Sequence, residues 1–159
     1  MSLNTSPLAQ SINTGYLSLL ETGSIGRQAY TTVWNNAYYD YADGAIGDIS
    51  TIANPASTIG DALFSMVGYE VSNVDILAQS IAEYWSNSHL TPKAPAVSII
   101  GNNALSKVGD IKTAILDART DQLKLPPFKL LFDAIEPIIK TIVWTGTNSS
   151  GGTITGNVS

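Results

Sequence analysis

The stretch that decides the fold is residues 127–158, PFKLLFDAIEPIIKTIVWTGTNSSGGTITGNV. Its first part carries apolar side chains at helical spacing: Phe128, Leu131, Phe132, Ile135, Ile139 and Ile142. This spacing predicts an amphipathic helix over residues 127–143. Pro137 lacks the N–H that would bond to Asp133, so we expect the helix to kink or to end early there.

The second part of the stretch predicts a C-terminal β-hairpin. Two threonine-containing runs, residues 143–147 and 153–158, flank the five-residue connection NSSGG at 148–152. A glycine-containing connection of this length is typical of hairpins. The alternative is a disordered chain end. Trp144 argues against it, because disordered segments contain few aromatic residues.

The chain before this stretch is predicted to be mainly helical. Ser6 is the expected N-cap of the first helix, and Ser72 is the expected N-cap of a helix that runs to about Ser86. The prolines at 92 and 95 predict an extended crossing, which could continue as a strand at 97–100. The predicted helices are residues 7–21 and 27–42, the helix from its cap at Ser72 to about Ser86, a turn or short helix at 61–68, and a helix after residue 103 with Leu105, Val108, Ile111 and Ile115 on its apolar face. The sequence thus predicts a mainly α fold, with a domain of about five helices at residues 1–143 and a hairpin tail at residues 144–159.

One of these helices carries an aromatic stripe. Tyr30, Trp34, Tyr38 and Tyr41 recur at spacings of four, four and three, which places four large rings on one helix face. Amphipathic helices normally turn such a face to the core, and this is the interpretation we favour. The alternative is a partner-binding face, since Tyr and Trp are enriched at protein interfaces.

The composition and charge restrict the kind of protein. Hydrophobic residues make up 44% of the 159 residues and charged residues 13%, about half the charged fraction of typical globular chains. The net charge of −5 divides into −7 over residues 1–92 and +2 over residues 93–140, and residues 141–159 carry no charge. The seven bases at 93–140 are interleaved with acids, which disfavours nucleic-acid binding. No apolar run is long enough to span a membrane, and the N-terminus does not resemble a signal peptide.

No motif for catalysis, cofactor binding or metal binding is found. The chain has no cysteine and one histidine, His89, in a predicted turn. These ligands are too few for a zinc site, and no Gly-x-Ser-x-Gly motif presents a nucleophile. Asp40, Asp43 and Asp48 lie close in sequence but lack the EF-hand spacing, so we assign them turn and cap roles. We therefore expect a non-enzymatic protein without cofactor, metal or small-molecule ligand.

The uncharged tail is the predicted interaction site. Soluble proteins usually guard exposed strand edges with lysine, proline or a bulge. An unguarded hairpin is expected to pair with the body of its own subunit or with a neighbouring chain by strand addition. The residues predicted to make protein–protein contacts are Trp144, Thr145, Thr147, Thr153, Ile154, Thr155 and Val158.

Residues 70–159 resemble small virion proteins of tailed bacteriophages. The resemblance lies in short Ala/Ile-rich helices, one of which ends in IAEYWS at 81–86, in the proline-punctuated crossing at 91–97, and in the closing TGTNSSGGTITGNV at 145–158. It implies a structural subunit of the head, neck, tail or baseplate that contacts copies of itself and other virion proteins. The implied location is the virion; otherwise we expect a soluble cytoplasmic protein.

Two alternatives from other classes stay open at this point. One is a small bacterial binding or adaptor domain that uses the aromatic helix face. The other is an enzyme whose carboxylates converge only in the folded chain.

Overall fold

The computed structural model describes residues 3–23, 26–43, 49–51, 74–86, 90–92, 98–119 and 128–158. Within them lie five α-helices: α1 (Thr5–Thr22), α2 (Arg27–Asp43), α4 (Val74–Tyr84), α5 (Val108–Ala118) and α6 (Phe128–Ile139), with the 3-10 helix η4 (Ala104–Lys107) before α5. The strands are β1 (Ile49–Thr51), β2 (Leu90–Pro92), β3 (Ser98–Asn102), β4 (Val143–Thr147) and β5 (Thr153–Asn157). The prediction of a mainly α fold with a C-terminal hairpin is confirmed.

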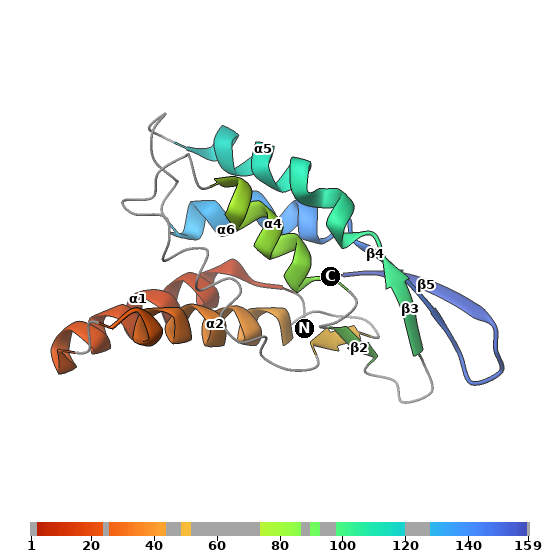
Figure 1. Ribbon diagram of the computed structural model, residues 1–159, viewed down its shortest axis with the longest axis horizontal. Helices are drawn as coiled ribbons and strands as arrows, with labels where there is room; N and C mark the ends of the chain where they lie inside the picture. The colour runs from red at the N-terminus through yellow and green to blue at the C-terminus, as the bar shows by residue number, and fades with distance from the viewer. Residues whose placement is uncertain are drawn as a thin grey trace.

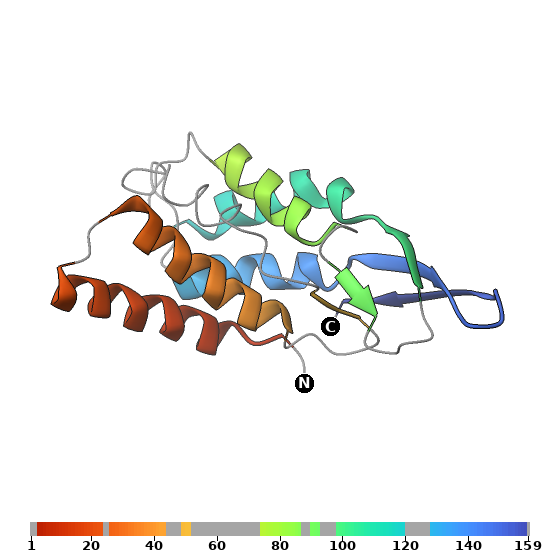
Figure 2. The same cartoon turned by 60° about the horizontal axis from the view of Figure 1, so that its bottom comes forward.

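The helices form two layers, with the hairpin at one end. α1 and α2 pack as an antiparallel pair, and α4, α5 and α6 lie together over this pair (Figure 1). α6 joins the layers because it contacts both α1 and α5. The hairpin of β4 and β5 extends from the opposite end to the α1–α2 turn (Figure 2). This arrangement places the C-terminal strands beyond the helices.

α1 begins earlier than predicted because another residue caps it. The side-chain oxygen of Asn4 accepts a hydrogen bond from the backbone N–H of Ser6 at 3.0 Å, and Asn4 has the extended backbone of an N-cap. The assignment of Ser6 as the cap was therefore wrong. Gly23 ends the helix in a left-handed conformation with φ of 71°, as its position near the predicted stop indicated.

A glycine inside α1 has a packing role. A Cβ atom added at Gly15 would lie 2.6 Å from Cγ1 of Val33 on α2. Contacts this short do not occur between real side chains, so glycine permits the close approach of the two helices. Its unfavourable helix propensity, about 1 kcal/mol relative to alanine, is therefore tolerated.

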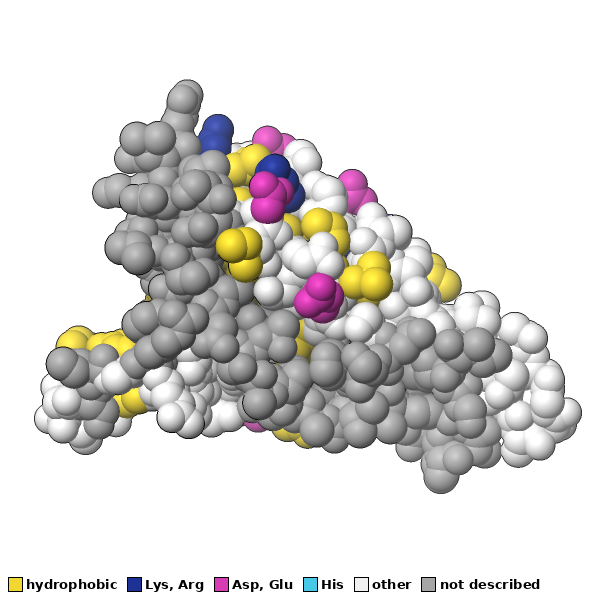
Figure 3. Space-filling model, viewed as in Figure 1, with side chains coloured by type: hydrophobic (Ala, Val, Ile, Leu, Met, Phe, Trp, Pro, Cys, Tyr) yellow, Lys and Arg dark blue, Asp and Glu magenta, His cyan; other side chains and the backbone are white. Residues whose placement is uncertain are grey.

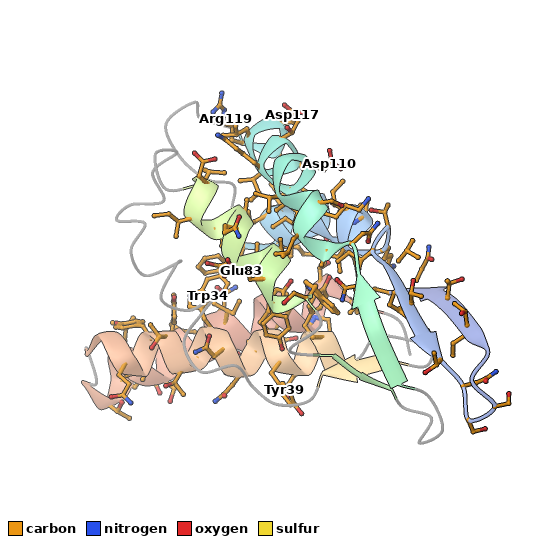
Figure 4. All side chains as sticks on the ribbon, turned by 45° about the vertical axis from the view of Figure 1, so that its right-hand side comes forward. Trp34, Tyr39, Glu83, Asp110, Asp117 and Arg119 are labelled. Atoms are coloured by element: carbon orange, nitrogen blue, oxygen red, sulfur yellow. The ribbon has the colours of Figure 1, made fainter. Side chains whose placement is uncertain are left out.

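The aromatic stripe of α2 forms the centre of the core. Trp34 is 1% exposed, its ring centroid lies 4.8 Å from that of Phe128, and the two rings meet edge to face. The indole N–H of Trp85 donates to the hydroxyl of Tyr38 at 2.9 Å. Tyr39, the next residue, points away from the helices above α2 (Figure 4). The interior interpretation is confirmed for Trp34, Tyr38 and Tyr41, whereas Tyr30 is only partly buried.

The helices of the second layer differ from their predictions at their ends. The predicted cap of α4, Ser72, lies outside the described residues. Leu105 is 55% exposed, so its placement on an apolar helix face was wrong. The reason is that η4 occupies this segment and turns Leu105 outward. The α-helical periodicity begins only at Val108, and both Ile111 and Ile115 are fully buried.

α6 ends soon after its internal proline. The helix stops at Ile139, two residues beyond Pro137 and four residues before the predicted end. Single turns follow, in which Ile142 donates its N–H to the carbonyl of Ile139 at 3.0 Å. The early end that Pro137 indicated is therefore found, and β4 begins at Val143.

The strands form two small antiparallel sheets. β1 pairs with β2, and the second sheet has the order β3-β4-β5. β5 is paired with β4 in regular register, whereas the pairing of β3 with β4 shifts between Ile99 and Gly101. The predicted hairpin and the predicted strand near 97–100 are both present. β4 begins at Val143, so it crosses the predicted boundary between residues 143 and 144.

Candidate functional site

The C-terminal hairpin is held to the body by backbone and asparagine hydrogen bonds. Val158 donates its N–H to the carbonyl of Ile142 at 3.1 Å. The side chain of Asn103 accepts from the N–H of Val143 at 2.8 Å, and the Asn103 N–H donates to the Val143 carbonyl at 3.2 Å. The Asn102 side chain donates to the carbonyl of Trp85 at 2.9 Å. These bonds fix the base of the hairpin against β3 and α4.

The sequence predicts a helix after residue 103 but no hydrogen-bonding role for Asn102 or Asn103. Their position just ahead of a helix start is a signal for side-chain to backbone bonding, because asparagine readily bonds nearby backbone groups. Only the fold shows that one of these bonds reaches across forty residues of sequence to β4.

A single asparagine organises the hairpin turn. The side-chain oxygen of Asn148 accepts from the N–H and the hydroxyl of Ser150 at 3.1 and 2.8 Å, and from the N–H of Gly152 at 2.8 Å. Gly151 has φ of 81°, a conformation that other residues rarely adopt. The turn residues therefore specify the reversal of the chain.

The inner face of the hairpin belongs to the core. Trp144 is 3% exposed and Val158 is 1% exposed, and Ile154 is partly buried against the same cluster. Gly156 lies directly across from Trp144, and a Cβ added there would come within 2.5 Å of the indole ring. The glycine therefore makes room for the tryptophan. Trp144 and Val158 are therefore buried in the core of the chain itself.

The outer face of the hairpin is lined by threonine. The cross-strand pairs are Thr145 with Thr155 and Thr147 with Thr153. The two β4 threonines are partly exposed and the two β5 threonines are exposed. The seven predicted contact residues thus divide by position, with the four threonines outside, Trp144 and Val158 inside, and Ile154 between the two groups.

β5 also presents an open backbone edge. In an antiparallel pair, residues exchange both backbone hydrogen bonds at alternate positions. The bond from Val158 to Ile142 sets this alternation, so the even residues of β5 bond to β4. The backbone groups of Thr153, Thr155 and Asn157 therefore point to the open side. Among the described residues, no strand pairs with that side of β5.

Charged side chains lie elsewhere on the molecule. On the face shown in Figure 3 they gather over α4 and α5, and the hairpin end has neither acidic nor basic side chains. Asp110, Asp117 and Arg119 mark the outer side of α5 in Figure 4. An ion pair of 2.6 Å between Lys112 and Asp75 links α5 to α4. The hairpin and the surface over α4 and α5 therefore differ in charge.

A second polar group lies where α6 meets α1. The hydroxyl of Thr5 donates to the carboxylate of Asp133, and the ammonium of Lys129 lies 2.8 Å from the same carboxylate. The Lys129 bond, followed by the Thr5 bond, lowers the pKa of Asp133. Burial raises the pKa of Tyr41, with Glu136 adding to the effect. Glu136 itself lies 3.9 Å from Lys140.

Each of these two carboxylates, Asp133 and Glu136, thus lies beside a lysine one helical turn away. The described residues contain no group of three or more metal-binding side chains and no helix long and apolar enough to cross a membrane. His89 and Asp48, considered in the sequence analysis, lie outside the described residues.

Comparison of the chain with protein-family models, with curated proteins and with solved structures finds no match.

Proposed function

We propose that this protein is a non-enzymatic structural subunit of a bacteriophage virion. Its C-terminal hairpin would contact copies of itself and other virion proteins in the head, neck or tail. The observation that carries the proposal is the regular, uncharged strand β5, which lies at the edge of its sheet and has threonines on its outer face. Natural proteins rarely leave such an edge unguarded unless another chain covers it.

The surrounding surface supports the same proposal. Residues 141–159 contain no charged side chain, so neither electrostatic repulsion nor a strongly hydrated group opposes contact there. Strand addition supplies affinity through backbone bonds and needs no deep pocket. The resemblance to tailed-phage virion proteins agrees with this mode of contact.

The alternative of a binding or adaptor domain is disfavoured because its proposed ligand-binding face is buried in this fold. Its ligand face would be the aromatic stripe of α2, yet Trp34, Tyr38 and Tyr41 are buried within the chain's own core. No second function is favoured by a specific observation.

The experiment uses the whole chain, because removing the hairpin would take Trp144 and Val158 out of the core. The chain is followed in purified particles of the virus of which it is the proposed subunit. Lysine at the edge position, Thr155→Lys, is compared with Thr32→Lys on the exposed side of α2. Both variants change the net charge equally. Quantitative mass spectrometry of purified particles should show wild-type incorporation for Thr32→Lys and a loss of at least tenfold for Thr155→Lys. Equal incorporation of the two variants, or absence of the wild-type chain from particles, would contradict the proposal.

A further inference from the structure

We infer that the partner of the β5 edge is a second copy of this chain, paired antiparallel about a twofold axis that passes midway between the two copies of Thr155. The inference rests on the proposed function in one respect, the use of the hairpin as the contact surface. It adds the identity of the partner, the direction of the strand and the register.

The register follows from the backbone of β5. Thr153, Thr155 and Asn157 direct their backbone groups to the open side, as derived from the Val158–Ile142 bond. An antiparallel copy centred on Thr155 places Thr155 opposite itself and Thr153 opposite Asn157. Each of these pairs joins two residues with outward backbone groups, so each can exchange both hydrogen bonds. The edge is therefore self-complementary in this register.

The side chains fit the same register. On the inner side of the sheet, Ile154 would face Gly156 of the second copy. On the outer side, Thr155 faces Thr155, a favourable cross-strand pair. The absence of charge means that identical copies do not repel one another. In a twofold interface the same residues of both copies are in contact, as they are in this register.

The position of the hairpin permits this pairing. β5 runs from the hairpin tip toward the body, and the tip extends beyond the helices (Figure 2). An antiparallel copy therefore has its body at the opposite end of the shared sheet, whereas a parallel copy would bring both bodies to the same end. The opposite side of the sheet is a poorer candidate, because the register of β3 is shifted between Ile99 and Gly101 and β2 contacts it. Bulges of this kind hinder edge pairing.

The register can be tested by disulfide formation, because the natural chain has no cysteine. In a hydrogen-bonded antiparallel pair the Cα atoms are about 5.5 Å apart, which is within the range that a disulfide bridges. We expect oxidised Thr155→Cys to form a covalent dimer. Thr153→Cys alone and Asn157→Cys alone should stay mainly uncrosslinked, whereas a mixture of these two variants should form the heterodimer. Ser149→Cys, at the hairpin tip, is the control for random collision.

Native mass measurement of the whole chain completes the test. The wild-type chain should be dimeric, and Thr155→Lys should raise the dissociation constant at least tenfold while Thr32→Lys leaves it unchanged. Equal crosslinking of Thr155→Cys and Ser149→Cys would overturn the inference. So would a monomeric wild-type chain whose Thr155→Lys variant is nevertheless excluded from particles; in that case the proposed function survives and the partner is a different protein.

Discussion

The helical body and the C-terminal hairpin contribute to one core but differ in how much of their surface they leave uncovered. In the body, the aromatic face of α2 is covered by rings from α4 and α6, and its polar atoms bond within the chain, as Trp85 does with Tyr38. In the hairpin, only the inner face is covered in this way. Its outer face carries partly exposed and exposed threonines, and no described strand pairs with the β5 edge.

The difference shows that the hairpin has two separable roles. Residues of even number, including Trp144 and Gly156, face the core, whereas odd residues such as Thr145 and Thr155 face outward. Since side chains alternate along a strand, the same short segment can support the fold and present a contact surface. Changes at even positions should therefore alter stability, and changes at odd positions should alter association.

The largest expected effect is the loss of Trp144. Trp144→Ala removes a buried ring at the junction of hairpin and body, and such truncations lower the free energy of unfolding by about 3–5 kcal/mol. Urea unfolding followed by circular dichroism measures the change. The matched control is Thr145→Ala, the next residue, for which a change of about 0.5 kcal/mol or less is expected. Similar losses for both variants would refute the division into even and odd positions.

In the helical body, the buried residue to compare with Trp144 of the hairpin is Tyr38. Tyr38→Phe keeps the ring but leaves the buried indole N–H of Trp85 without its acceptor, which lowers the free energy of unfolding by about 1–3 kcal/mol. Tyr39→Phe is the control, because Tyr39 points away from the helices (Figure 4). The same urea experiment measures both variants. If Tyr38→Phe is as stable as the wild type, the polar bonds of the core contribute less than the packing of its rings.

Sequence reasoning succeeded where local spacing determines structure. The period of four in the α2 stripe predicted a buried face, the NSSGG connection predicted the hairpin, and Pro137 predicted an early end of α6. In each case the residues involved are neighbours in the chain. Local chemistry was sufficient to predict them.

Contacts between distant segments, by contrast, leave little signal in local spacing. The sequence groups Trp144 and Val158 with the threonines as contact residues, because an uncharged segment does not reveal which of its faces meets the body. The glycine at 156 was a usable signal, since glycine opposite a tryptophan indicates space for its ring. The register that places them opposite each other depends on the β4–β5 pairing and on the anchor at Asn103.

A smaller effect tests the close approach at Gly156. Gly156→Ala places a methyl group within 2.5 Å of the Trp144 ring, and overpacking of this kind lowers the free energy of unfolding by about 1–3 kcal/mol. The control is Gly109→Ala on the exposed side of α5, where an added methyl group meets no other described atom within 4 Å. That change should raise stability by up to about 1 kcal/mol.

The two glycine variants are thus expected to have opposite signs. A double variant, Trp144→Ala with Gly156→Ala, separates strain from backbone effects. Its loss should be smaller than the sum of the two single losses, because the methyl group no longer meets a ring. An additive result would show that Gly156 is required for its backbone and not for the space it leaves.

The smallest expected effect concerns the link between α1 and α6. Because Lys129 and Thr5 lower the pKa of Asp133 in the folded chain, the unfolded chain takes up a proton at that carboxylate at higher pH. The stabilisation is therefore fully present above the ordinary aspartate pKa of about 3.9 and is lost as the pH falls from there through the lower pKa of the folded chain. Asp133→Asn should flatten the acid side of a plot of unfolding free energy against pH between 6 and 3.

Asp110→Asn on α5 is the control for Asp133→Asn, because the hydrogen bonds from Thr5 and Lys129 go to Asp133 and not to Asp110. The pair of Asp133 with Lys129 is partly exposed, so we expect a modest difference that diminishes as salt is added. If Asp133→Asn and Asp110→Asn give the same profile, the N-terminus of α1 is held to α6 by apolar contacts of Leu8 and Ile12 alone. The body would then resemble the hairpin in relying on packing and not on charge.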